Sequence, residues 1–473
     1  MAAGTRHPKL PGENSRMPPT QKTIASLAAD LAAGRATSVA LTEAALDRIA
    51  DPAGEGARVF ISPDPAAARA TALAQAEASD RLRAAGIVPS PLAGIPISVK
   101  DLLDVAGQVT AAGSVVLRGA PPAGADAPVV ARLRAAGAVI VGRTNMTEFA
   151  FSGLGFNPHH GTPGNPFDRA RIPGGSSSGA AVSVADGMAA GAIGSDTGGS
   201  VRIPAALCGL AGFKPTQSRV PRTGALPLSW TLDTIGPLAR SVECCALLDA
   251  VLAGEPPAAP AAMAVSGLRL AVPREIVLDG LDETVAAAFA RALDRLSRAG
   301  ARIAEFSMPA LTRIAEANGK GGFATAEALA WHKDLLEDRG DEYDPRVAVR
   351  IRRGAEQSAV DYIDLLAART SIMTEAAAQT RDFDALVLPT VPLVAPRFDE
   401  LEKDADYARL NVMMLRNPSL FNFLDRPAVT LPCATDGLPV GVMLVGKRHH
   451  DHRLLAMALG VEPVINRRRA SRQ

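Results

Sequence analysis

Cysteine is scarce in this sequence, and its spacing excludes a fold built on disulfides. Cys208, Cys244, Cys245 and Cys433 are spread over 473 residues, and none has the paired spacing of a zinc site. We interpret them as reduced, buried thiols. The run from Lys447 to His452 holds three histidines, but adjacent side chains point apart, so a solvated turn is the better interpretation. We therefore expect neither a metal nor a cofactor.

The sequence also lacks an excess of charge of one sign and long hydrophobic runs. Fifty basic and 49 acidic residues give a formal net charge of +1, which offers no overall field for nucleic acid or an anionic membrane. No uninterrupted apolar run reaches the roughly 18 residues of a membrane helix. The first 22 residues lack the apolar core of a signal peptide. These absences predict a cytoplasmic protein that binds a small molecule, not a nucleic acid or a membrane.

The ends of the chain lack the apolar periodicity of packed helices or strands. Residues 1–22 are predicted to form a mobile tail and residues 467–473 a basic tail, which leaves residues 23–466 as the folded part. That length fits one large domain or two ordinary ones. The Pro- and Ala-rich segment 254–266 could be a linker between domains or a surface loop within one.

Between the tails, β-prone runs alternate with alanine-rich helical segments. Thr37 and Ser38 offer capping hydroxyls before one of the early helices. The alternation predicts an α/β fold in which one extended mixed sheet is covered by helices on both faces. The predicted strands are 95–99, 138–141, 189–194, 268–272, 302–306, 385–388, 428–431 and 440–444, and the predicted helices include 26–33, 38–49, 129–136, 180–188 and 203–210.

The most informative stretch, residues 172–216, contains two clusters of glycine and serine, around Ser176 and Ser200. A helix and a short strand are predicted between them, so the chain can return and bring both serines to one site. Glycine lets backbone N–H groups converge on one point, and such a nest can stabilise an oxyanion. This pattern favours a serine nucleophile over a flexible turn.

A serine nucleophile needs a base, and histidine is too scarce and too scattered here to supply one. The alternative base is a lysine that burial keeps neutral. Lys100 fits this requirement because it ends the apolar run GIPISVK at a predicted strand terminus. We therefore expect Lys100 to share a site with the two serines.

These motifs resemble those of the amidase signature family. The matching segments are GIPISVKD at 94–101, PGGSSSG at 173–179, GSDTGGSVRIPA at 194–205 and GFKPT at 212–216, and the similarity extends from about residue 27 to residue 446. The family fold is a single sheet surrounded by helices, which implies that residues 23–466 form one catalytic domain and that 254–266 is a loop. A homodimer is common among such proteins.

The resemblance also implies a role for each matching residue. Ser200 would be the acylated nucleophile, Lys100 the base, and Ser176, held by a cis peptide after Gly175, the relay between them. Amides of the nucleophile loop would form the oxyanion hole, and further polar residues would support the triad. The implied oxyanion residues are Thr197, Gly198 and Gly199 together with the Ser200 amide, and the implied supporting residues are Asp101, Ser177, Ser178, Asp196 and Arg202.

The implied reaction is hydrolysis of a carboxylic amide to the acid and ammonia or an amine. An alternative is the glutaminase component of a tRNA-dependent amidotransferase, although the tyrosines here are scattered and residues 326–354 look like those of stand-alone amidases. A catalytically silent scaffold is a third hypothesis. Small aliphatic amides, arylacetamides and dicarboxylic half-amides all remain open as substrates. Residues 158–171, 317–331 and 413–423 are predicted to shape the acyl site, and Phe421 and Phe423 hint at an apolar acyl group.

Overall fold

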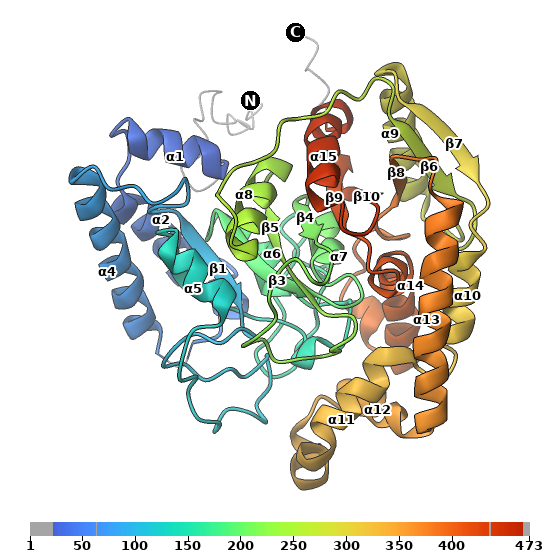
Figure 1. Ribbon diagram of the computed structural model, residues 1–473. Coiled ribbons are helices and arrows are strands. Elements are labelled where there is room, and N and C mark those ends of the chain that lie inside the picture. Colours follow the sequence, from blue (N-terminus) through green and yellow to red (C-terminus); the bar gives the residue numbers. More distant parts are fainter. Residues whose placement is uncertain (1–21, 63, 435–436, 467–473) are drawn as a thin grey trace, which may run out of the picture.

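The computed structural model describes residues 22–62, 64–434 and 437–466, and one ten-stranded sheet runs through them (Figure 1). The strand order is β2-β1-β3-β5-β4-β9-β10-β8-β6-β7. The predicted α/β fold in a single domain is therefore confirmed, while the predicted tails lie outside the described residues except for Lys22. The strands are β1 Pro96–Lys100, β2 Val139–Thr144, β3 Gly191–Asp196, β4 Ala211–Lys214, β5 Thr234–Ala239, β6 Arg269–Pro273, β7 Arg302–Phe306, β8 Ala385–Pro389, β9 Ala428–Ala434 and β10 Val440–Val445.

The sheet is parallel at its two ends and antiparallel in its centre. β1 pairs in parallel with β2 and β3, and β6 pairs in parallel with β7 and β8. The pairs from β3 through β5, β4, β9 and β10 to β8 are all antiparallel. The segment 254–266 is the loop between α8 and β6, and because β6 belongs to the same sheet it does not separate two domains.

Helices cover both faces of the sheet. α8, α9 and α15 contact the central strands, and α15 also contacts the other two helices, while α6 contacts β1, β2 and β3 and α7 contacts β4, β9 and β10. Figure 1 shows α4 and α13 at opposite ends of the molecule. The helices are α1 Ile24–Ala32, α2 Ser38–Ala50, α3 Gly56–Val59, α4 Pro65–Ala84, α5 Pro128–Ala135, α6 Ser178–Ala185, α7 Arg202–Leu207, α8 Val242–Ala253, α9 Glu283–Arg298, α10 Ala310–Ala317, α11 Gly322–Arg339, α12 Pro345–Arg352, α13 Ala359–Gln379, α14 Asp404–Phe423 and α15 Asp451–Ile465.

Local sequence explains where several of these elements begin. The Thr37 hydroxyl accepts a hydrogen bond from the Ala40 N–H at 3.1 Å, as the predicted cap of α2 requires. All six residues of β3 are buried, as expected for a strand covered on both faces. No helix within the described ranges combines the length and hydrophobicity that a membrane-spanning segment requires.

Parallel pairing of β1 and β3 brings the predicted site residues to one edge of the sheet. Val99 pairs with Ile193, so Lys100 at the end of β1 lies beside the last residues of β3. The loop that carries Ser200, the predicted nucleophile loop, follows β3 directly, and the loop that carries Ser176 leads into α6, which packs on the same strands. Residues far apart in the sequence therefore meet where the parallel strands end.

Candidate active site

Lys100 and Ser176 are in direct contact. The Lys100 Nζ atom lies 2.7 Å from Ser176 Oγ and 2.9 Å from Ser195 Oγ. Lys100 and Ser176 are fully buried, and no ion pair within the described residues includes Lys100. The amine is thus surrounded by hydroxyl groups and has no carboxylate partner.

Burial changes the protonation of this lysine. Removal from water lowers the pKa of Lys100 to about 7, and the charges of Asp196 and Asp233 only partly oppose that shift. Near neutral pH a large share of Lys100 is therefore the uncharged amine, which can accept a proton from a neighbouring hydroxyl.

The loops of Ser176 and Ser200 are joined by a backbone hydrogen bond. The Ser177 N–H donates to the Ser200 carbonyl at 3.3 Å, so the backbone just after Ser176 lies against the backbone of Ser200. The Gly175–Ser176 peptide bond is cis, and the Thr147 N–H donates to the Ser176 carbonyl at 3.1 Å. The three predicted triad residues are therefore gathered in one buried region.

Glycine is required where the Ser176 loop passes its neighbour. A Cβ atom on Gly175 would lie only 2.5 Å from the backbone nitrogen of Gly155, which is closer than real Cβ contacts. A Cβ atom on Gly155 would lie 2.4 Å from the Gly174 carbonyl oxygen. The two loops can approach this closely only because both positions lack side chains.

A buried ion pair fixes the start of the nucleophile loop. Asp196 and Arg202 form a bidentate pair with distances of 3.0 Å and 2.8 Å, and Asn422 of α14 bonds to both side chains. Burial alone would raise the pKa of Asp196, but the charge and hydrogen bonds of Arg202 hold it well below its usual range. The predicted supporting role of Asp196 and Arg202 fits this geometry, because Ser200 lies between them in the chain.

The amides of the nucleophile loop differ in what they bond. The Gly199 N–H, one of the implied oxyanion donors, donates to Asp196 Oδ1 at 2.9 Å in this structure. The N–H groups of Gly198 and Ser200 donate to no acceptor within the described part of the chain. The Thr197 hydroxyl donates to Asp233 at 2.5 Å, which anchors the first residue of the loop. Gly198 and Ser200 thus remain as backbone donors for a ligand.

The other implied supporting residues lie around the triad in different ways. Asp101 accepts hydrogen bonds from Arg143 Nε and the Gly113 N–H, both at 2.9 Å, and so fixes the turn that follows Lys100. The Ser177 hydroxyl reaches the Ser195 carbonyl at 3.4 Å. The Ser178 hydroxyl is buried without a hydrogen-bond partner among the described residues, so its implied supporting hydrogen bond is not observed.

Comparisons with known proteins give the family. The amidase family model matches residues 41–455. The chain belongs to the amidase family. A 2-amino-5-chloromuconic acid deaminase from Comamonas testosteroni is 40% identical over 405 residues, which cover 84% of this chain and 87% of that protein.

Two further relatives extend this similarity over almost the whole amidase. The glutamyl-tRNA(Gln) amidotransferase A component of Symbiobacterium thermophilum is 36% identical, covering 91% of this chain and 94% of its own length. A solved amidase structure is 35% identical with a TM-score of 0.84 and covers 94% of this chain and 100% of its own. The protein is therefore a hydrolase that acts on carbon–nitrogen bonds of amides.

A cavity of about 330 Å³ lies beside the predicted catalytic groups of the amidase. Ser195 and Thr197 line one part of it, and residues 222–228 with Trp230 form much of the remaining wall. None of its lining residues belongs to 158–171, 317–331 or 413–423, the segments predicted to shape the acyl site. Phe421 and Phe423 are buried in the core and do not line it.

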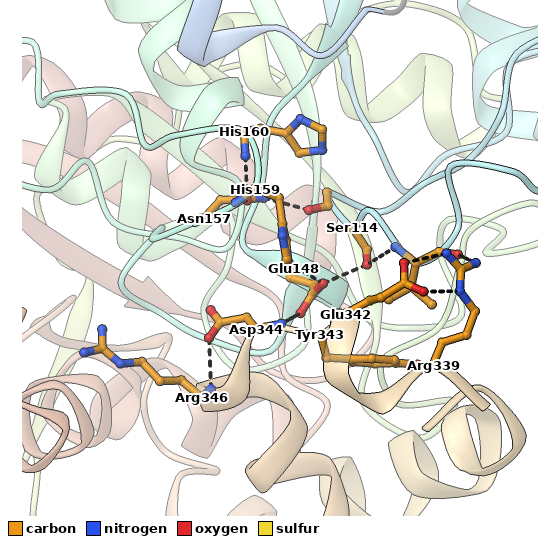
Figure 2. Close-up of polar contacts among 12 residues, drawn as sticks. Ser114, Glu148, Asn157, His159, His160, Arg339, Glu342, Tyr343, Asp344 and Arg346 are labelled. Carbon is orange, nitrogen blue, oxygen red and sulfur yellow. Dashed lines mark hydrogen bonds and ion pairs between the residues drawn. The ribbon is translucent and has the colours of Figure 1, made fainter. Parts of the chain in front are cut away.

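Figure 2 shows a hydrogen-bond network centred on Glu148, a residue that lies in the chain between a contact of Ser176 and the cavity. The buried Glu148 carboxylate accepts from the Ser114 hydroxyl at 2.7 Å and from the Asp344 N–H at 2.7 Å, and His159 Nε2 lies 2.8 Å away. Thr147, which bonds to the Ser176 carbonyl, immediately precedes Glu148. Ala150, which lines the cavity with a left-handed φ of 60°, follows it by two residues. One carboxylate thus positions both sides of the site.

Several residues of the amidase site were not predicted. Ser195 stands within the GSDTGGS motif, so its contact with Lys100 could have been inferred from its position at the end of a strand. Glu148 begins a single 3-10 turn, Glu148–Ala150, and Asn422 lies on a helix more than 200 residues from its partners. Neither carries a local sequence signal that distinguishes it from an ordinary polar residue.

Proposed function

We propose that this amidase hydrolyses a small carboxylic amide to the acid and ammonia or an amine, through an acyl-enzyme on Ser200. The observation that carries the proposal is the contact between Lys100 Nζ and Ser176 Oγ at 2.7 Å, fully buried and without a carboxylate partner. An amine in that setting serves as a base rather than as half of an ion pair.

The proposed reaction begins with two proton transfers. Neutral Lys100 takes the proton of Ser176, which takes the proton of Ser200, and the Ser200 oxygen attacks the amide carbon. The Gly198 and Ser200 N–H groups, with the Thr197 amide, donate hydrogen bonds to the carbonyl oxygen and stabilise its negative charge. As the tetrahedral species collapses, the relay returns a proton to the leaving nitrogen, because an amide anion does not leave unaided. Water then releases the acid by the same route, and no cofactor takes part.

Labelling with a fluorophosphonate tests the assignment of the nucleophile. The wild-type protein is expected to be labelled stoichiometrically and to release ammonia from a panel of primary amides. Ser200→Ala should abolish both, and Ser176→Ala should retain only slight activity. Ser307→Ala is the matched control, because Ser307 is an exposed serine that bonds to Glu275 on the surface. Stoichiometric labelling of Ser200→Ala at another serine would refute the assignment.

A second candidate is the glutaminase component of an amidotransferase, which the similarity to the Symbiobacterium protein favours. The three tyrosines favour a stand-alone amidase, because they contact different residues and do not form the tyrosine cluster expected of the glutaminase component. Tyr343 bonds to His332, Tyr362 to Glu327 and Tyr407 to Ser152. Hydrolysis of glutamine in preference to other amides, with activity that rises when a partner protein is added, would favour the amidotransferase instead. We further propose a cytoplasmic location, which cell fractionation can test, and a homodimer, which size-exclusion chromatography with light scattering can test.

A further inference from the structure

The wall of the cavity beside the catalytic groups is held rigidly from two sides. The Asp233 carboxylate accepts hydrogen bonds from the Leu228 and Ser229 N–H groups at 3.0–3.1 Å and from the Thr197 hydroxyl. On the other side, Glu327 of α11 accepts from the Thr231 N–H at 3.1 Å and from the hydroxyls of Ser229 and Thr231. The segment 228–233 is therefore fixed to the nucleophile loop and to a helix.

Trp230 stands in the middle of this fixed segment, yet it is 49% exposed. It lines the cavity together with apolar residues that include Leu226 and Leu228. A large aromatic side chain held half in solvent by an anchored backbone is suited to pack against the apolar part of a ligand.

Arg222 lines the same cavity and carries a charge that no carboxylate neutralises directly. One of its N–H groups donates to the Trp230 carbonyl at 2.5 Å, and no ion pair among the described residues includes it. The nearby carboxylate of Asp233 is occupied by Thr197, Leu228 and Ser229. The remaining N–H donors of the guanidinium are therefore free to bind an anion, and a carboxylate matches their planar geometry.

We propose that the cavity selects amides whose acyl group carries a second carboxylate, that is, half-amides of dicarboxylic acids. The carboxylate binds Arg222, the carbon chain packs against Trp230 and the leucines, and the amide reaches the nucleophile past Ser195 and Thr197. A volume of about 330 Å³ falls in the range of small-molecule sites. This inference rests on the proposed amide hydrolysis for its chemistry, but the binding it describes does not require turnover.

Matched substrate pairs test the selectivity. Ammonia release is measured for succinamic acid against butyramide and for glutaramic acid against valeramide, which have the same chain lengths but lack the carboxylate. The wild-type protein should prefer the half-amide by at least about tenfold in kcat/KM, in line with a charge-assisted pair of about 1.5–3 kcal/mol. In Arg222→Gln the ratio should fall towards one, and Arg222→Lys should keep part of it. Arg302→Gln, at the exposed edge strand β7, is the control that should keep the full ratio.

Two outcomes overturn the proposal. One is a wild-type protein without preference for the half-amides. The other is an Arg222→Gln variant that loses both classes equally, which would make Arg222 only a support for the Trp230 backbone.

Calorimetry on Ser200→Ala separates binding from chemistry. Glutaramic acid should bind this inactive variant at least ten times more tightly than valeramide, and the double variant with Arg222→Gln should lose that difference. If turnover is absent in every assay but this difference is found, the proposed hydrolysis fails and the carboxylate site stands. If amides are hydrolysed but the difference is absent, the carboxylate site fails and the hydrolysis stands.

Discussion

Asn422 bonds to Asp196 across 226 residues of sequence. Its Nδ2 atom donates to Asp196 Oδ1 at 2.9 Å and to the Asp196 carbonyl at 3.0 Å, while its Oδ1 atom accepts from Arg202 at 2.7 Å. All three side chains are almost completely buried. Helix α14 thereby fixes the residues on both sides of Ser200, so the nucleophile loop depends on a part of the chain that contains none of the family motifs described above.

Replacing Asn422 by leucine should weaken both the fold and catalysis. Leucine leaves an Arg202 N–H donor without an acceptor and removes one hydrogen bond from each of two Asp196 oxygens, which keep other donors. An unsatisfied buried group costs about 1–3 kcal/mol, and the lost hydrogen bonds add to that. We expect urea unfolding to show a loss of about 2 kcal/mol or more and kcat to fall at least tenfold. Val412→Ala, on the exposed side of the same helix, should change neither measurement appreciably. Equal effects of the two substitutions would rule out this role for Asn422.

The rate of amide hydrolysis should depend on the protonation of Lys100. Because burial lowers its pKa to about 7 and only the neutral amine accepts a proton, kcat should rise about tenfold per pH unit below that value and level off above it. The measurement is kcat between pH 5 and 9 with chemistry limiting. Asp249→Asn is the control, since the pKa of that buried carboxyl is also raised to about 7 but it pairs with Arg219 away from the triad. A profile that is flat from pH 6 to 9 would argue against Lys100 as the base.

Lys100 should reduce the stability of the folded protein while it serves catalysis. Its pKa is about 10.5 in the unfolded chain and about 7 in the folded protein, so between these values the unfolded state binds more protons. Its cost to folding is therefore full below about pH 7 and declines as the pH rises towards 10.5.

Lys100→Met should accordingly be inactive but more stable than the wild-type protein. The gain in unfolding free energy, measured by denaturant at several pH values, should be largest at or below pH 7 and shrink between pH 7 and 10. A variant that is destabilised at every pH would contradict the assignment of a buried amine with a lowered pKa.

Glu148 should prove essential to the shape of the site although it is not part of the triad. Glu148→Ala removes the acceptor of the Ser114 hydroxyl, the Asp344 N–H and the His159 ring. We expect a loss of about 2 kcal/mol or more in unfolding free energy, together with a raised KM, because Ala150 lines the cavity. Glu342→Ala, which breaks a surface pair with Arg339, should cost less than about 1 kcal/mol and leave KM alone. A wild-type KM in Glu148→Ala would disprove the positioning role.

Hydrophobic patterning predicted most of the sheet but missed its centre. The predicted strand 302–306 coincides with β7, and the other predicted strands each overlap an observed one. The strands β4 and β5 were not predicted, because β4 has four residues and β5 contains Gly236 and Pro237, which usually argue against a central strand. Gly236 is needed there, since a Cβ atom would lie 2.0 Å from the Phe213 carbonyl oxygen. Tertiary packing therefore stabilises these two strands although their local sequence does not favour strand structure.

The contrast is sharper at the site. Lys100 and Ser176, 76 residues apart, could be paired from the sequence because their motifs carry the glycine, serine and strand signals that this chemistry needs. Asp233, Glu327 and Asn422 could not, because an isolated carboxylate or amide on a helix or turn looks the same whether it holds a catalytic loop or faces water. Only three-dimensional contact distinguishes them.

Much of the cavity wall comes from a stretch of the chain that follows the proposed proton-transfer groups, although Ser195 and Thr197 beside those groups also line the cavity. Residues 222–230, which form much of the wall, follow Lys100, Ser176 and Ser200 in the chain, and Glu327 of α11 holds the Thr231 N–H next to Trp230. Residues 222–230 can therefore vary while Lys100, Ser176 and Ser200 stay unchanged. Related enzymes can therefore change their substrate specificity through substitutions in this short segment while they keep the same reaction chemistry.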